Sequence, residues 1–232
     1  MRTVREREVT LRPALVVCDL LGTTMQADDV VPRAFAAVVA DEGVTLAAED
    51  IAAVRGATKR QALLGLLPAG PDLQGRVERA YARFQARLFA AYTPDTVRPV
   101  PGAAEALAGL RARGVRVVLN TGFDRTLAGH LLAALGWTAI ADAVVCGDDV
   151  AAGRPAPDLI LRAMALTGVS APPRVVNVGD TTLDLQAGAA AGVGWNIGVW
   201  SGAHDRARLA AAPHTHLLAS VAEVPAALGL DR

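Results

Sequence analysis

The chain has 232 residues, of which 52% are hydrophobic, and it carries 23 basic and 23 acidic residues. The balanced charge argues against binding to nucleic acid or to a membrane surface, and the length suits one domain with an insertion or two small domains. The charged start, MRTVREREVTLRP, lacks the apolar stretch of a signal peptide, and no apolar run approaches the ~20 residues of a membrane span, so we expect a cytoplasmic protein.

Short apolar runs rich in valine recur along the chain, and each ends in polar residues or glycine. Because apolar and polar residues do not alternate within these runs, they are typical of strands buried on both faces of a parallel sheet. The predicted strands cover residues 14–19, 115–122, 143–149, 174–181, 194–202 and 215–220.

Segments of helical length separate the later strands, with apolar residues three or four positions apart. These predicted helices cover residues 102–114, 124–136, 157–168 and 182–192. Strands that alternate with helices form right-handed crossover units. The sequence therefore predicts an α/β protein with a doubly wound parallel sheet.

The first strand is not followed by a second one in the usual way, because residues 25–98 show helical spacing and no convincing strand. Helices are predicted over 32–43, 58–67 and 75–92, and a proline-rich linker over 93–102 returns the chain to the sheet. We interpret residues 25–98 as a small all-helical cap domain, inserted into a core domain made of residues 1–24 and 99–232.

Chemically active side chains follow the predicted strands. Asp19, Thr121 and Asp180 come directly after three of them, Asp184 lies one helical turn later, and Arg154 follows a fourth. In open α/β sheets the carboxyl ends of the strands form the ligand-binding edge. Three converging carboxylates call for a divalent cation, and oxygen ligands suit Mg²⁺. A carboxylate there can also attack phosphorus, with Arg154 and Thr121 stabilising the charge that develops.

Four short segments, DLLGTT, NTGF, GRPAPD and GDTTLD, stand in this order along the chain. Together they resemble the four motifs of the haloacid dehalogenase (HAD) superfamily of phosphotransferases. The resemblance implies a Rossmann-like core with Asp19 as nucleophile, and Thr121 and Arg154 as the groups that hold the phosphoryl group. The metal ligands that it implies for Mg²⁺ are Asp19, the carbonyl of Leu21, Asp180 and Asp184.

The first motif departs from most of this superfamily at Leu21, where the usual residue is a second Asp that protonates the leaving alkoxide. Leucine cannot do so. Either another acid replaces it, or the leaving group needs no proton. His204, in WSGAHD after the fifth predicted strand, is one candidate for the acid; the alternative is a loop histidine that caps the helix after it.

One branch, the phosphonatases, lacks this Asp and cleaves a carbon–phosphorus bond in phosphonoacetaldehyde. The present chain resembles it in the GTT ending of the first motif, in the arginine of the third motif, in the TGFDR of the second, and in a lysine in GATK. From this resemblance we expect Thr23, Gly122 and Arg125 to contact the substrate. We add His204, which lies at the same edge of the predicted sheet, and Arg55, which adds charge near the mouth of the site.

Lys59 is the only lysine in the chain. In the phosphonatases the matching lysine forms a Schiff base with the substrate aldehyde. A protonated imine accepts the electrons of the breaking C–P bond, and an arginine cannot form one. The alternatives are a surface helix residue or a cation that only binds the phosphoryl group. Two positions depart from the branch: Arg55 replaces a Met and Ala62 replaces a His, so the substrate stays unassigned.

The sequence thus predicts a Mg²⁺-dependent HAD hydrolase of the phosphonatase-like branch, acting through Asp19 on a small phosphonate or phosphate. A phosphate monoesterase that uses another acid is the first alternative. The second is a binding protein that kept the fold and lost catalysis, in which Leu21 would reflect the lost activity. The family likeness also suggests a homodimer that forms through the cap.

Overall fold

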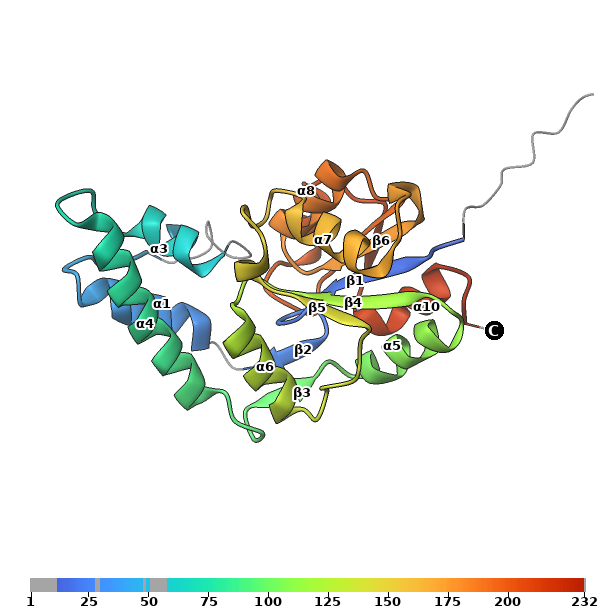
Figure 1. The fold of residues 1–232 in the computed structure, drawn as a ribbon, viewed down its shortest axis with the longest axis horizontal. Helices are drawn as coiled ribbons and strands as arrows, with labels where there is room; N and C mark the ends of the chain where they lie inside the picture. Colours follow the sequence, from blue (N-terminus) through green and yellow to red (C-terminus); the bar gives the residue numbers. More distant parts are fainter. Residues whose placement is uncertain (1–11, 28–29, 48, 51–57, 232) are drawn as a thin grey trace, which may run out of the picture.

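The computed structural model describes residues 12–27, 30–47, 49–50 and 58–231 (Figure 1). Within these residues the chain forms one six-stranded sheet, a two-stranded ladder and a set of helices. No helix among them combines the length and the apolar character needed to cross a membrane.

The main sheet has the order β5-β4-β1-β6-β7-β8, and every pairing in it is parallel. The chain builds β4 and β5 on one side of the first strand and then crosses to build the others on the opposite side. This reversal creates a crevice at the carboxyl end of β1, where such sheets bind ligands. The strands are β1 (Leu15–Asp19), β4 (Arg116–Asn120), β5 (Ala143–Val145), β6 (Val175–Gly179), β7 (Trp195–Val199) and β8 (His216–Leu218).

Helices cover both faces of the sheet. Alternate residues of β1 belong to different hydrophobic clusters: Val16 and Cys18 pack on one face, Leu15 and Val17 on the other, and all four are fully buried. This burial explains the continuous apolar run of the first strand. The helices of this core are α5 (Ala103–Ala112), α6 (Arg125–Ala134), α7 (Asp158–Thr167), α8 (Thr182–Ala191), α9 (Arg206–Ala210) and α10 (Val224–Ala227), with short 3₁₀ turns η1 (Gly147–Asp149), η2 (Pro172–Arg174) and η3 (Val221–Glu223).

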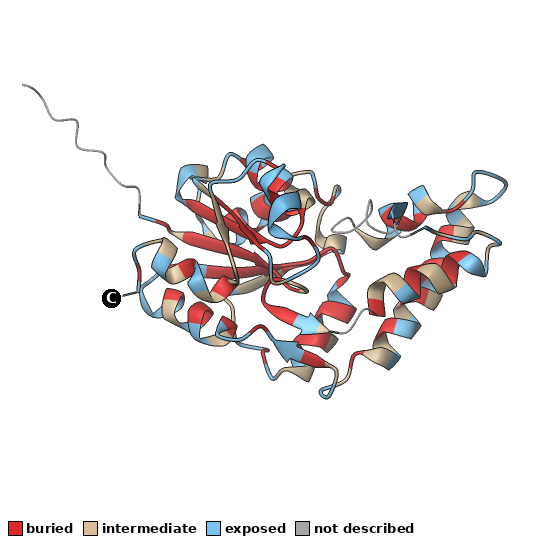
Figure 2. Ribbon diagram, turned by 180° about the vertical axis from the view of Figure 1, so that it is seen from behind, coloured by how far each residue is buried: buried red, intermediate tan, exposed pale blue. Residues whose placement is uncertain are grey.

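Three further helices, α1 (Val30–Ala40), α3 (Lys59–Leu66) and α4 (Leu73–Ala91), stand together beside one end of the sheet (Figure 1). We call residues 30–91 the helical insert. Its helices pack against each other and carry buried residues along their length (Figure 2), and the rings of Phe35 and Phe84 lie with their centroids 4.5 Å apart. The prediction of three helices in this stretch is confirmed, with small shifts at their ends.

The prediction that residues 25–98 contain no strand is wrong at both ends. Strand β2 (Met25–Ala27) pairs with β3 (Val97–Pro99) in an antiparallel ladder, with Gln26 opposite Arg98. Runs of three residues are too short to show a two-residue periodicity, and β3 ends in a proline inside a proline-rich stretch. The ladder ties the start of the helical insert to its end.

Candidate active site

A cavity of about 420 Å³ opens at the carboxyl ends of β1, β4 and β6, and the helical insert forms part of its wall. Asp19, Thr121, Arg154 and Asp180 line it from the sheet side, and Lys59 lines it from the insert. The structure therefore brings together the predicted nucleophile, two predicted phosphoryl-binding groups, a predicted metal ligand and the only lysine.

Asp19 is the last residue of β1, and its buried side chain pairs with Arg154. The Nη1 of Arg154 lies 2.8 Å from Oδ1 of Asp19 and also contacts Oδ1 of Asp184. Burial raises the pKa of Asp19 to about 6; the charge of Arg154 opposes this rise and that of Asp184 adds to it. The two carboxylates hold the pKa of Arg154 above its ordinary value, so this side chain is a fixed cation beside the predicted nucleophile.

Asp180 follows β6 and is held by hydrogen bonds on both carboxylate oxygens. Thr23 donates its hydroxyl to Oδ1 at 3.0 Å, and the backbone N–H of Ala203 donates to Oδ2 at 2.7 Å. The backbone packs closely here, because a Cβ added at Gly22 or at Gly202 would lie 2.2 Å from Oδ2. Thr23 is fully buried, lies outside the cavity wall and orients Asp180, and its contact with a substrate stays a prediction.

Asp184 lies in the first turn of α8 and caps that helix. Its Oδ2 accepts from the backbone N–H of Thr181 at 2.9 Å and from the Thr181 hydroxyl at 2.5 Å, and its Oδ1 contacts Arg154. Asp184 lies behind the cavity wall rather than in it. It completes the buried charge cluster and pairs with Arg154, and its role as a metal ligand stays a prediction.

The donors at this edge fit a hard divalent cation. Asp19, Asp180 and Leu21 all line the cavity, and they offer the carboxylate and carbonyl oxygens that Mg²⁺ prefers. Arg154 pairs with Asp19 and Asp184 but makes no ion pair with Asp180. Burial and the two neighbouring carboxylates raise the pKa of Asp180 to about 7. More positive charge is needed for all three carboxylates to ionise, and a bound cation would provide it.

The second motif, NTGF, forms another part of the cavity wall. Thr121 and Gly122 directly follow β4 and line the cavity, and the Thr121 hydroxyl accepts from the backbone N–H of Phe123 at 3.2 Å. The ring of Phe123 is buried and supports the amine of Lys59, whose Nζ lies 4.9 Å from the ring centroid.

Lys59 is the first residue of α3, and its position is set by contact between the insert and the core. A Cβ at Gly153 would lie 2.2 Å from Cγ2 of Thr58, so the loop that carries Arg154 packs directly against the residue before Lys59. Burial and the charge of Arg154 lower the pKa of Lys59 to about 8, against the opposing effect of Asp19. An amine with this pKa is partly neutral near physiological pH.

Two predicted substrate contacts, Arg125 and His204, do not line the cavity. Arg125 is more than half exposed, and its side chain pairs with Asp149 and with the carbonyl of Val144. His204 is buried, and its Nδ1 accepts from the backbone N–H of Thr182 at 3.1 Å. It therefore caps the preceding helix, α8, and not the helix after it. Arg55 lies outside the described residues.

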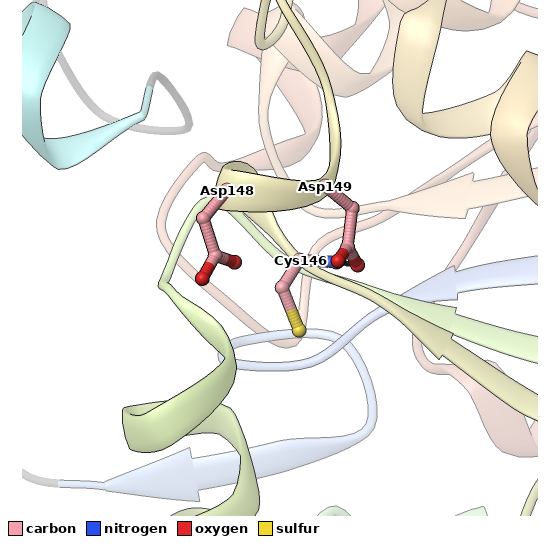
Figure 3. Close-up of side chains that lie close together, drawn as sticks. All are labelled: Cys146, Asp148 and Asp149. Carbon is pink, nitrogen blue, oxygen red and sulfur yellow. Dashed lines mark hydrogen bonds between the residues drawn. The ribbon is translucent and has the colours of Figure 1, made fainter.

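Cys146, Asp148 and Asp149 form a second group of metal-type ligands, with ligand atoms within 4.8 Å of one another (Figure 3). Their hydrogen bonds are structural. Asp149 accepts from the backbone N–H of Cys146 at 2.8 Å and pairs with Arg125, while Asp148 accepts from the Arg125 backbone N–H at 3.0 Å. The group holds η1 against the start of α6.

The sequence analysis missed one wall of the cavity. Gln26, Thr96 and Arg98 line it from the β2–β3 ladder and its approach, and Val31 and Phe35 line it from α1. The sequence did contain a signal for this wall, because an inserted segment has to leave and re-enter the core at neighbouring points. Both linkers therefore had to lie near the end of β1.

Comparison with known proteins places this site in a family. The model of the haloacid dehalogenase-like hydrolases matches residues 13–192, which include all four motifs. The chain belongs to the haloacid dehalogenase-like hydrolases. It is therefore a hydrolase, and the predicted family is confirmed.

Several curated relatives carry the name phosphonoacetaldehyde hydrolase. The chain is 28% identical over 206 residues to a phosphonoacetaldehyde hydrolase of Hahella chejuensis, covering 82% of this chain and 69% of that protein. It is 34% identical over 146 residues to a phosphonoacetaldehyde hydrolase of Bacillus thuringiensis (strain Al Hakam), covering 62% of this chain and 52% of that protein. The second match thus spans about half of the relative's length.

Solved structures agree on the fold. A phosphonoacetaldehyde hydrolase-like protein from Oleispira antarctica superposes with a TM-score of 0.80 at 20% identity, over 94% of this chain and 91% of that one. A HAD family hydrolase from Deinococcus radiodurans, solved with bound phosphate and sodium, superposes with a TM-score of 0.66 at 27% identity, over 95% and 98%.

Proposed function

We propose that this HAD hydrolase cleaves the carbon–phosphorus bond of a carbonyl phosphonate, with Asp19 as nucleophile and Lys59 as the amine that forms an imine. One observation carries the proposal: the amine of Lys59 lines the same cavity as Asp19 and Arg154, and burial beside Arg154 lowers its pKa. The curated relatives named phosphonoacetaldehyde hydrolase support the same reaction class.

The first step takes place at Lys59. Its neutral amine adds to the substrate carbonyl, and a proton and the loss of one water give a protonated imine. Phe123 packs beneath the amine, and the contact of Gly153 with Thr58 holds the start of α3 against the core. These contacts support the amine in the cavity that Asp19 also lines.

The second step takes place at Asp19, whose carboxylate attacks phosphorus as the carbon–phosphorus bond breaks. The electron pair of that bond moves into the imine and gives an enamine, while the phosphoryl group passes to Asp19. Arg154 and Thr121 lie where they can stabilise the phosphoryl oxygens. When bound, Mg²⁺ held by Asp19, Asp180 and the Leu21 carbonyl would neutralise further charge on these oxygens.

Water completes the reaction. The enamine takes up a proton on carbon, one water hydrolyses the resulting imine, and a second hydrolyses the aspartyl phosphate. One water is released when the imine forms, so the net reaction consumes one water and yields a methyl carbonyl compound and phosphate. No acid is needed to protonate an oxygen leaving group, which accounts for Leu21 at the position where most of the family has Asp.

Trapping with borohydride tests this proposal. Borohydride added during turnover of phosphonoacetaldehyde should reduce the imine and inactivate the enzyme, and the added mass should map to the peptide that holds Lys59. Lys59 is the only lysine, so the N-terminal amine is the one competing primary amine to check.

Two variants separate imine chemistry from charge. Lys59→Arg keeps the positive charge but cannot form an imine, so it should lose carbon–phosphorus cleavage as fully as Lys59→Ala. If Arg at this position retains most activity and borohydride has no effect, the imine is excluded. Hydrolysis of phosphate esters would then be the better assignment.

A further inference from the structure

The cavity has a second polar wall, on the β2–β3 ladder instead of the ends of the main sheet. Gln26 and Arg98 stand opposite each other in the ladder, so their side chains share one face, and Thr96 lies two residues before Arg98. An apolar wall from α1, including Val31 and Phe35, lines the same cavity. None of these groups has a role in the reaction at phosphorus.

Arg98 differs from the other two cations of the described wall. Arg154 is paired with two carboxylates, and Lys59 has the role proposed above. Arg98 is exposed, and its Nη2 donates to the backbone carbonyl of Asp95 at 3.2 Å. Among the described residues it forms no ion pair with an Asp or Glu, so most of its five N–H donors remain available to a ligand.

The cavity is also large for a small aldehyde. About 420 Å³ falls within the range of roughly 300–1,000 Å³ typical of sites for ligands of drug size. Neither the attack of Asp19 on phosphorus nor the imine at Lys59 gives the β2–β3 wall a role. A longer fragment could pack on Val31 and Phe35 and reach Arg98.

We propose that Arg98, with Gln26 beside it, recognises a carboxylate on the leaving fragment of the substrate. The substrate class is then a keto phosphonate that carries a carboxylate beyond the carbonyl. A single guanidinium matches a single carboxylate through two parallel hydrogen bonds. This assignment rests on the proposed function for the chemistry at phosphorus. It adds the chemical nature of the fragment that leaves.

A matched pair of ligands tests the assignment: 5-phosphono-4-oxopentanoate and its methyl ester, which differ in one negative charge. Binding is measured by calorimetry with Mg²⁺ present, on the Asp19→Asn variant, which lacks the proposed nucleophile. The acid should bind about tenfold more tightly than the ester, as expected for one charge-assisted contact. Because Arg98 is exposed, this preference should shrink as the salt concentration rises.

Variants of Arg98 test whether this residue causes the preference for the acid over the ester. Adding Arg98→Gln should weaken binding of the acid to the level of the ester and leave the ester unchanged, whereas Arg98→Lys should keep part of the difference. Arg162→Gln removes an exposed arginine from α7, outside the cavity wall, and should leave both affinities unchanged.

The assignment is overturned if the acid binds no better than the ester, or if the preference survives in Arg98→Gln. Neither result depends on carbon–phosphorus cleavage, because the variant is tested for binding alone. Failure of the borohydride experiment with a retained preference for the acid would instead reject the imine and keep the carboxylate site.

Discussion

At the level of single residues, the site is shaped by the side chains at two positions, Leu21 and Lys59. Leu21 lines the cavity and brings no proton, and Lys59 brings an amine with a pKa lowered to about 8. Their combination favours a carbon leaving group, whose electron pair moves into an imine, over an oxygen leaving group that departs as an alkoxide.

Leu21→Asp should give the enzyme activity on phosphate monoesters. A carboxylic acid at this position can protonate an alkoxide, so hydrolysis of simple phosphate monoesters should rise by about 10²–10⁴-fold, the range of general acid catalysis. Initial rates on a panel of monoesters measure this gain, with Leu21→Asn as a control of similar size that cannot release a proton. Equal rates in the two variants would show that the acid is not used.

The rate of carbon–phosphorus cleavage should rise with pH through about 8. Imine formation needs the neutral amine, and burial and Arg154 lower the pKa of Lys59 to about 8. The neutral fraction therefore rises from pH 6, reaches about one half near pH 8, and levels off only above about pH 9. Single-turnover rates between pH 6 and 9 measure the profile. A rate that is flat over this range would mean that the amine is not the limiting group.

At the level of elements, a buried polar contact joins the helical insert to the core. Asp124 is the N-cap of α6, with Oδ1 accepting from Leu127 at 2.9 Å, and its Oδ2 accepts from the Tyr81 hydroxyl and the Gln85 amide of α4. Asp124 directly follows Phe123, the ring beneath Lys59. The position of α4 is thereby linked to the position of the amine.

Tyr81→Phe should lower kcat/KM several-fold with little loss of stability, about 1 kcal/mol for one hydrogen bond. Asp124→Ala should cost more stability, because it also removes the cap of α6. Asp205→Ala is the matched control, since Asp205 caps α9 in the same way and forms no hydrogen bond with the described residues of the insert. Thermal unfolding with steady-state kinetics separates the effects. If Asp205→Ala lowers kcat/KM as much, the link has no specific role.

At the level of the whole molecule, the order of strands decides where function lies. The chain places β4 and β6 on either side of β1, so three strand ends deliver the proposed nucleophile, the proposed phosphoryl-binding hydroxyl and a proposed metal ligand to one crevice. The helical insert, tied down by the β2–β3 ladder, then closes that crevice from one side and delivers the amine.

Mg²⁺ should stabilise the folded protein, because a ligand that binds only the folded state adds RT ln(1 + [L]/Kd), about 2.7 kcal/mol at one hundred times Kd. Differential scanning fluorimetry with EDTA and with increasing Mg²⁺ measures the shift in Tm. Asp180→Asn should reduce the shift strongly, while Asp158→Asn, on α7 and outside the cavity wall, should keep it. Equal shifts in both variants would place the metal elsewhere.

We also expect a homodimer that forms through the helical insert. A shallow hollow of about 300 Å³ lies between α1 and α4, lined by Val30, Ala34, Ala90 and two arginines, Arg33 and Arg87. Light scattering after size-exclusion chromatography measures the mass, and Ala90→Glu should shift a dimer toward monomer. Arg162→Glu is the control. A monomeric wild type at micromolar concentration would contradict this expectation.

The parallel α/β core and the residues at its catalytic edge could be predicted from the amino-acid sequence. Buried strands are continuous apolar runs, and the residues directly after them lie at one edge by the geometry of parallel sheets. Asp19, Thr121 and Asp180 could therefore be placed together without coordinates. The helices of the insert could be predicted from their periodicity in the same way.

The remaining parts of the site depend on tertiary contacts. Thr23 turned toward Asp180 and His204 toward the start of α8, because buried polar groups take the nearest unsatisfied partner, and spacing along the chain does not show which partner that is. The β2–β3 ladder, which brings Arg98 to the cavity, joins segments some seventy residues apart through strands too short to leave a pattern. Local periodicity records burial within an element, whereas the contacts between distant elements are fixed by packing.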